Sequence, residues 1–132
     1  MVDDETMIAI GLGCRKGCTG EAIAALVRSA LADACCSDAP ATLFTHADKR
    51  NEPGLAAAAQ ELRMPLVFLE AEILQQASGR AATRSERVLR LFGLPSIAEA
   101  AALAGAGPAS ILLLPRISEG GASCAIAGKG KA

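Results

Sequence analysis

Short apolar runs alternate along this chain with longer segments in which apolar residues recur at helical spacing. The first run, at residues 7–10, is continuous and predicts a strand that is buried on both faces. After it, apolar side chains recur three and four positions apart between Ala22 and Leu31, which predicts a helix that continues to about Ala34. Thr19 precedes this helix, and we expect its side chain to cap the helix N-terminus.

The same alternation continues to the end of the chain. Further apolar runs predict four more strands, at residues 41–45, 66–69, 110–114 and 123–127. We expect helices over residues 53–62, from residue 70 to about 74, over residues 85–91, and after Ser96 as an N-cap, the last ending at Gly105 and Gly107. The stretch 75–84 has no apolar period, and we interpret it as a mobile loop.

This order of elements predicts an α/β fold. We expect residues 1–132 to form a single three-layer α/β/α domain with a mixed sheet of about five strands. About eight residues separate the last two strands, too few for a crossover helix, so the sheet should end in an antiparallel pair. In sheets of this kind, ligands bind beyond the carboxyl ends of the parallel strands.

Composition narrows the classes of function. The chain has 13 lysines and arginines against 14 acidic residues, a net charge of −1, which argues against non-specific binding of nucleic acid. Three phenylalanines and no Trp or Tyr argue against a surface that stacks bases. No apolar run approaches the roughly 20 residues of a membrane span, and the first residues, MVDDET, are acidic, so we expect a soluble, cytoplasmic protein without a membrane partner.

The five cysteines do not resemble a disulfide framework. Their odd number and their spacing indicate reduced thiols. Cys14 and Cys18 are four residues apart, but the chain supplies neither a second such pair nor more than one His, so we expect no metal site.

A glycine-rich, basic segment follows the first strand. It contains, in order, Gly11, Leu12, Gly13, Cys14, Arg15, Lys16 and Gly17. Glycines allow a backbone to approach a ligand closely, the next helix presents unpaired N–H groups, and Arg15 and Lys16 favour carboxylates, so the segment predicts an anion site. The alternative is a tight turn in which the glycines serve packing alone. As a nucleotide motif the segment is weak, because it is one residue longer than the dinucleotide fingerprint.

A polar loop follows the second predicted strand. His46, Asp48, Lys49 and Glu52 together offer an acid, a base and a cation to general acid–base chemistry. The alternative is a solvated loop in which Glu52 caps the helix that begins near Pro53.

Taken in order, these segments resemble the family of cobalamin biosynthesis proteins formed by CobE and the C-terminal domain of CbiG. The matching residues are 11–17, Thr45, Lys49, Glu52, Gly54, Leu55, Ser85, Val88, Gly93, 96–103 and 125–127. The chain departs from the family pattern in having Ala47 where an Asp is usual, with Asp48 one place later, Arg116 in place of a Lys, and Cys124 in place of a Thr.

The resemblance implies work on the corrin ring. It implies a protein that binds a precorrin or corrinoid intermediate and assists or catalyses a step around ring contraction, which in CbiG is the opening of a lactone. If the protein is an enzyme, we expect Lys49, Glu52 and His46 to be its catalytic residues, with Glu52 or His46 moving protons. If it is not, we expect a tetrapyrrole carrier. The substrate-binding residues so implied are Gly11, Gly13, Cys14, Arg15, Lys16, Gly17, Thr45, Ser85, Glu99 and Arg116.

No cofactor is expected, and other enzymes of cobalamin biosynthesis are candidate partners. The alternative function is a regulatory domain that binds a nucleotide or another anion without catalysis.

Overall fold

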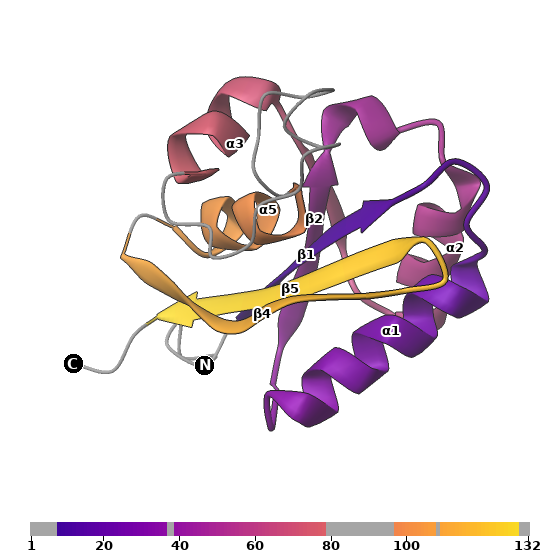
Figure 1. Cartoon of the computed structure of the whole chain (residues 1–132), viewed down its shortest axis with the longest axis horizontal. Coiled ribbons are helices and arrows are strands. Elements are labelled where there is room, and N and C mark those ends of the chain that lie inside the picture. Colours follow the sequence, from indigo (N-terminus) through magenta and orange to yellow (C-terminus); the bar gives the residue numbers. More distant parts are fainter. Residues whose placement is uncertain (1–7, 37–38, 79–96, 108, 130–132) are drawn as a thin grey trace.

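A mixed five-stranded sheet organises the part of the chain that the structure describes. The computed structural model describes residues 8–36, 39–78, 97–107 and 109–129. The strands are β1 (Ile8–Cys14), β2 (Ala41–His46), β3 (Leu66–Leu69), β4 (Ser110–Glu119) and β5 (Ala122–Lys129). They lie in the order β3-β2-β1-β5-β4. Figure 1 views the sheet from the side of the β4–β5 pair, with β1 and β2 behind that pair. The predicted α/β fold and mixed sheet are therefore confirmed.

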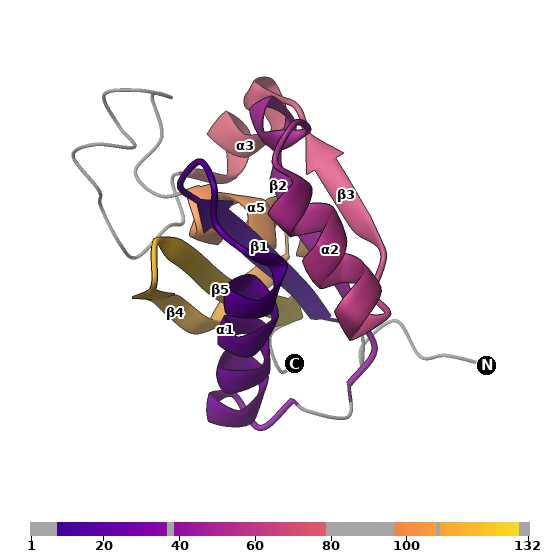
Figure 2. The same cartoon turned by 90° about the vertical axis from the view of Figure 1, so that its right-hand side faces the viewer.

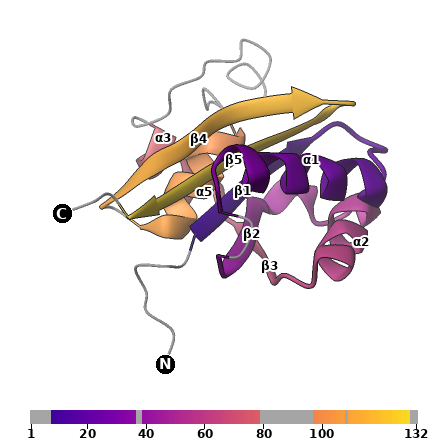
Figure 3. The ribbon, with the colours of Figure 1, turned by 90° about the horizontal axis from the view of Figure 1, so that it is seen from below.

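Strand directions bring several loops to one edge of the sheet. β1, β2 and β3 are parallel, whereas β5 pairs antiparallel with both β1 and β4. The carboxyl ends of β1, β2 and β3 consequently share one edge, here called the carboxyl edge, with the turn between β4 and β5. In Figure 3 the end of the β4–β5 pair lies at the same end of the molecule as the loop from β1 to α1.

Helices cover both faces of the sheet. α1 (Gly20–Asp33) and α2 (Pro53–Leu62) lie on one face, and α3 (Ala71–Ser78) and α5 (Ile97–Ala106) lie on the other (Figures 1 and 2). Alternation along β1 explains the arrangement, because Ile8, Ile10 and Leu12 pack in the core beneath α1 and α2. The opposite face of β1 meets α5, whose small alanines allow close packing. The three-layer prediction holds.

Gly11 is the point at which α5 comes closest to β1. A Cβ added to Gly11 would collide with the carbonyl oxygen of Ala98, whereas one added to Gly13 would lie 3.8 Å from the Ile97 Cβ, an ordinary contact. Gly11 is therefore required for the helix to approach the sheet, as the packing alternative foresaw for this glycine.

Several predicted boundaries were wrong. β1 continues to Cys14, so Gly11 and Gly13 are strand residues and not turn residues, because they pair with β5. β4 and β5 are longer than predicted, and only Gly120 and Gly121 separate them, although their antiparallel pairing is confirmed. The longer β4 contains two register shifts, around Leu114, that absorb extra residues.

Two helix predictions also need correction. The expected loop at 75–84 begins too early, because α3 extends to Ser78 and buries Leu74 and Ala77 on one face. Gly105 lies inside α5 against Phe44, and Gly107, with φ +103°, follows the helix end. The predicted helix at 85–91, the Ser96 cap and most of the predicted loop lie outside the described residues.

Candidate functional site

Residues Arg15 to Cys18, here called the basic turn, leave the carboxyl end of β1. The Cys18 N–H donates to the Arg15 carbonyl at 3.3 Å, and Gly17 has φ +87°, the conformation that a type II turn requires at its third position. The side chains of Arg15 and Lys16 are exposed. The sequence-predicted cations thus stand at the carboxyl edge, where a ligand can reach them.

Three contacts from other parts of the chain hold the basic turn. The Arg15 N–H donates to the Gly121 carbonyl at 2.9 Å. The Cys18 thiol donates to the Gly120 carbonyl oxygen, with 3.7 Å between sulfur and oxygen. The Gly17 N–H donates to Glu52 Oε2 at 3.2 Å. The turn is therefore fixed both to the tip of the β4–β5 pair and to the loop before α2.

Glu52 does not cap α2 with its side chain. It occupies the N-cap position, but its carboxylate makes no capping hydrogen bond and reaches Gly17 instead. The capping alternative is therefore wrong, because the start of α2 is packed so closely against the turn that the carboxylate meets the Gly17 N–H. A Cβ added to Gly54 would collide with the Cys18 carbonyl, which shows this closeness.

The N-termini of α1 and α2 converge on the basic turn. Thr19 caps α1 as predicted, its hydroxyl accepting from the Ala22 N–H at 3.1 Å. A Cβ added to Gly54, the second residue of α2, would lie 3.4 Å from the Gly20 N, so the first turns of the two helices lie close together. Two positive helix ends and the cations of the turn together make this region favourable for a carboxylate.

The pKa of the Cys14 thiol depends on its burial and on the charges around it. Burial raises its pKa from 9.0 to about 11, the Lys49 ammonium opposes the rise, and Cys18 and Glu52 add to it. Lys49 and Glu52 are thus close enough to Cys14 to influence the pKa of its thiol. The structure brings Cys14, Gly17, Lys49 and Glu52 together, and the thiol stays protonated at neutral pH, which makes it a poor nucleophile.

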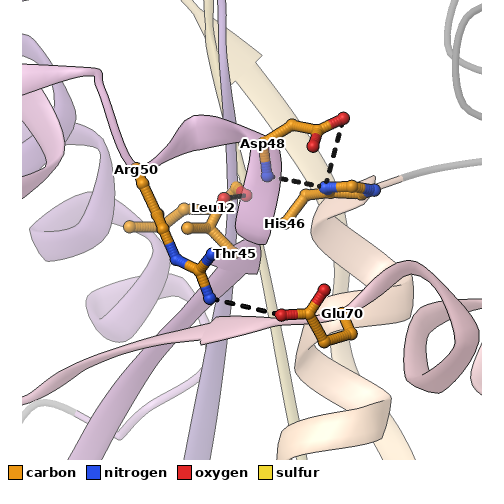
Figure 4. Close-up of polar contacts among 6 residues, drawn as sticks. All are labelled: Leu12, Thr45, His46, Asp48, Arg50 and Glu70. Atoms are coloured by element: carbon orange, nitrogen blue, oxygen red, sulfur yellow. Dashed lines mark hydrogen bonds and ion pairs between the residues drawn. The ribbon is translucent and has the colours of Figure 1, made fainter.

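His46 lies apart from this group. Leu43 packs beneath α1 and α2 and Phe44 packs on the opposite face, so strand alternation places the His46 side chain on the α3–α5 face. The side chain is buried, and Nδ1 accepts from the Asp48 N–H at 3.0 Å (Figure 4). His46 therefore caps the short 3-10 helix Ala47–Lys49 and is not brought to the basic turn.

Thr45 and Arg50 also have structural partners in Figure 4. The buried Thr45 hydroxyl donates to the Leu12 carbonyl at 2.7 Å, which ties β2 to β1 near the carboxyl edge. The Arg50 guanidinium pairs with Glu70 at 3.2 Å and lies 5.9 Å from the centre of the Phe68 ring.

Glu99 and Arg116 meet each other at a distortion of β4. The Glu99 side chain is fully buried and accepts from the Arg116 backbone N–H at 2.9 Å. The register shift between Leu114 and Ile117 takes Arg116 out of the regular ladder, and the carboxylate supplies the acceptor that the ladder does not. In this structure the Glu99 carboxylate is buried against the backbone of β4, while the half-buried Arg116 keeps its cation on the edge strand.

The other predicted residues are placed as follows. Gly11 is covered by α5, Gly13 lies in β1 near its carboxyl end, and Ser85 lies outside the described residues. Within the described part of the chain, no group of three or more His, Cys, Asp or Glu could hold a metal ion, and no helix is long and apolar enough to cross a membrane.

Sequence reasoning missed Gly120 and Gly121 as part of this region. A glycine doublet is typical of a turn, but only the strand order, which puts β5 beside β1, shows that this turn meets Arg15 and Cys18.

Comparisons with known proteins agree in pointing to one pathway. A family model described as the cobalamin synthesis G C-terminus matches residues 8–127. The chain is 37% identical over 122 residues to Protein CobE of Sinorhizobium sp, a match that covers 92% of this chain and 79% of that protein.

Solved structures agree in fold as well. A crystal structure of CobE, described as a protein from the cobalamin (vitamin B12) biosynthetic pathway, matches with a TM-score of 0.81 and 36% identity, covering 92% of this chain and 89% of the other. The cobalamin biosynthesis protein chiG of Agrobacterium tumefaciens matches with a TM-score of 0.74 and 32% identity, covering 94% of this chain and 99% of the other.

Proposed function

Since the chain belongs to the cobalamin synthesis G C-terminus family and is a protein of cobalamin biosynthesis, we propose that it binds a precorrin or corrinoid intermediate through the basic turn. The ligand groups that this site selects are the carboxylate side chains of the tetrapyrrole. Arg15 and Lys16 meet them from the exposed side of the turn, and Lys49 meets them from the loop after β2.

One observation carries the proposal. The Gly17 N–H already holds a carboxylate in this structure, that of Glu52, at 3.2 Å. The acceptor is the protein's own, but it supports the view that this turn, at the meeting point of two helix N-termini, is built to favour carboxylates.

The nucleotide alternative is less well supported by the same geometry. In dinucleotide-binding folds the glycines lie in the turn that cradles the phosphates. Here Gly11 and Gly13 are paired within β1, and α5 covers Gly11, so neither lines a phosphate loop.

Within this proposal, Lys49 and Glu52 have different roles in a catalyst and in a carrier. In a catalyst that opens a corrin lactone, the Lys49 ammonium stabilises developing negative charge, and Glu52 moves a proton. In a carrier, the same residues hold the intermediate without consuming it. The position of His46 on the opposite face of the sheet favours Glu52 over His46 for proton transfer.

The test removes the two exposed cations of the turn. The probe is cobyrinic acid, a corrin with free carboxylates, and its binding is followed by absorbance. The double variant Arg15→Ala/Lys16→Ala should weaken binding by about tenfold or more, the range of charged hydrogen bonds, while melting as the wild type does.

A double variant that removes two cations elsewhere, Arg28→Ala/Arg63→Ala, is the matched control. Both arginines are exposed and lie away from the turn, Arg28 in the middle of α1 and Arg63 after the end of α2. The proposal is wrong if both double variants bind cobyrinic acid as the wild type does, or if both lose affinity equally.

A further inference from the structure

The turn between β4 and β5, here called the hairpin tip, consists of Gly120 and Gly121. It contacts both ends of the basic turn. Gly121 accepts from the Arg15 N–H at 2.9 Å, and Gly120 presents its carbonyl oxygen 3.7 Å from the Cys18 Sγ. Because Arg15 and Cys18 are the first and last residues of the basic turn, the hairpin tip determines where that turn stands.

We propose that the hairpin tip is a positioning element of the corrin-binding site, with Gly121 as its key residue. The proposal rests on the proposed function, since the turn it positions carries the two cations assigned to the ligand. Gly121 touches the turn and not the ligand, so its effect on binding is indirect.

The surroundings of Gly121 explain why a glycine is needed there. Its φ is +85°, and an added Cβ would lie 3.3 Å from the Cys18 Sγ and 3.5 Å from the Arg15 Cδ. A side chain at this position would therefore press on the Cys18 sulfur, at the last residue of the basic turn, and would contact Arg15 at an ordinary distance. Gly120 also has a positive φ, +61°, but an added Cβ there would meet nothing within 4 Å.

The sheet gives the contact its rigidity. β1 and β5 remain in register up to the pair formed by Cys14 and Ala122, and the Arg15–Gly121 hydrogen bond follows directly after that pair. A displacement of the hairpin tip thus passes to Arg15 without an intervening flexible segment. In this way β4 and β5 influence the position of the basic turn that follows β1.

The experiment compares Gly121→Ala with Gly120→Ala in the full chain. Both substitutions place an alanine at a positive φ, but only Gly121→Ala crowds the basic turn. Amide hydrogen exchange at Arg15 to Cys18 measures, without any ligand, how well the hydrogen bonds that hold the turn are kept, and titration with cobyrinic acid measures binding. Cys18→Ala in the Gly121→Ala background removes the sulfur that the new Cβ would meet, with Cys18→Ala alone as its baseline.

We expect Gly121→Ala to speed exchange at the Arg15 amide and to weaken cobyrinic acid binding about threefold to tenfold, the range of one hydrogen bond. Gly120→Ala should do neither, and Cys18→Ala should reverse part of both effects of Gly121→Ala. Equal exchange at Arg15 in the two glycine variants would overturn the proposal. If the wild type does not bind cobyrinic acid, the proposed function fails, and the exchange comparison still decides whether the hairpin tip positions the turn.

Discussion

At the residue scale, the contacts of the proposed site residues Lys49 and Glu52 differ from those of His46 and Glu99. Lys49 and Glu52 lie close enough to the Cys14 thiol to shift its pKa, and Glu52 also fixes the Gly17 N–H. His46 and Glu99 are buried and hydrogen-bonded to backbone N–H groups, so their polar atoms serve the fold. Predictions about the site therefore concentrate on the first pair.

Replacing Lys49 tests the role of its charge. Lys49 is half-buried near the carboxyl edge, and one charge interaction near the surface contributes about 1 kcal/mol or less, so Lys49→Ala should change the melting temperature by only a few degrees. Cobyrinic acid binding should fall about tenfold. Arg28→Ala, whose side chain pairs with Glu61 on the surface, is the control and should bind normally. Normal binding by Lys49→Ala would show that the loop after β2 supports the fold and does not hold the ligand through Lys49.

Two substitutions at Glu52 separate holding the turn from moving a proton. Glu52→Gln keeps an oxygen that can accept from Gly17, so its stability should match the wild type. Glu52→Ala removes the acceptor from an exposed hydrogen bond and should lower the free energy of unfolding by about 0.5–1.5 kcal/mol. If the protein opens a lactone, Glu52→Gln should bind the intermediate but not consume it. Full turnover by Glu52→Gln would remove Glu52 from proton transfer.

Cys14 gives the protein a defined response to alkaline pH. Its thiol has a pKa of about 11 in the fold against 9.0 ordinarily, so above pH 9 the unfolded chain loses a proton that the folded chain retains. This contribution to stability is complete below pH 9 and is lost as the pH rises towards 11. Between about pH 8 and about pH 10, Cys14 should account for a loss of about 1 kcal/mol. Denaturant unfolding of the wild type and of Cys14→Ala at both pH values measures it, and equal losses would contradict the assignment.

At the scale of elements, the sequence pattern predicted most of what the backbone does. All five strands of the described residues were expected, as were α1, α2 and α5, because buried strands form continuous apolar runs and helices repeat at three and four residues. Boundaries were less predictable where tertiary pairing extends an element. β1 includes Gly11 and Gly13 because β5 supplies their partners, which no local signal around those glycines reveals.

The sequence predicted the loop residues of the candidate site but not the contacts that hold them. Arg15, Lys16, Gly17, Lys49 and Glu52 belong to loops at the carboxyl ends of parallel strands, and the topology alone brings those loops together. The hairpin tip could not be assigned, because its neighbours depend on the strand order. The Glu52–Gly17 contact was also missed, because a glutamate just before a helix was expected to interact with the positive N-terminus of that helix.

The contact between β1 and α5 makes an element-scale prediction. Gly11→Ala should destabilise the protein by about 1–3 kcal/mol or more, because the new Cβ would collide with the backbone of α5 and force the helix away from the sheet. Gly13→Ala, two residues along the same strand, adds a Cβ with ordinary contacts to Ile97 and Ser123 and should cost less. Chemical denaturation of both variants measures the difference. Equal stabilities of the two variants would show that the packing of α5 on β1 does not require a glycine at position 11.

For the whole molecule, the arrangement concentrates its candidate chemistry at one edge of the sheet. The basic turn, the loop after β2 and the hairpin tip meet there, and the N-termini of α1 and α2 point to the same place. The rest of the described structure consists of a packed sheet and helices that hold these loops in position. A ligand with several carboxylates suits this edge better than a neutral one.

The most direct measurement is therefore a titration of the wild-type protein with two corrins that differ in charge. Cobyrinic acid carries free carboxylates, and cobinamide carries amides in their place on the same ring system, so the pair isolates the contribution of the charge. We predict saturable binding of cobyrinic acid that weakens with added salt, and binding of cobinamide that is at least about tenfold weaker, the effect of losing charged hydrogen bonds. Equal affinity for the two corrins, or no binding of either, would contradict the assignment of the basic turn to the carboxylates of a tetrapyrrole.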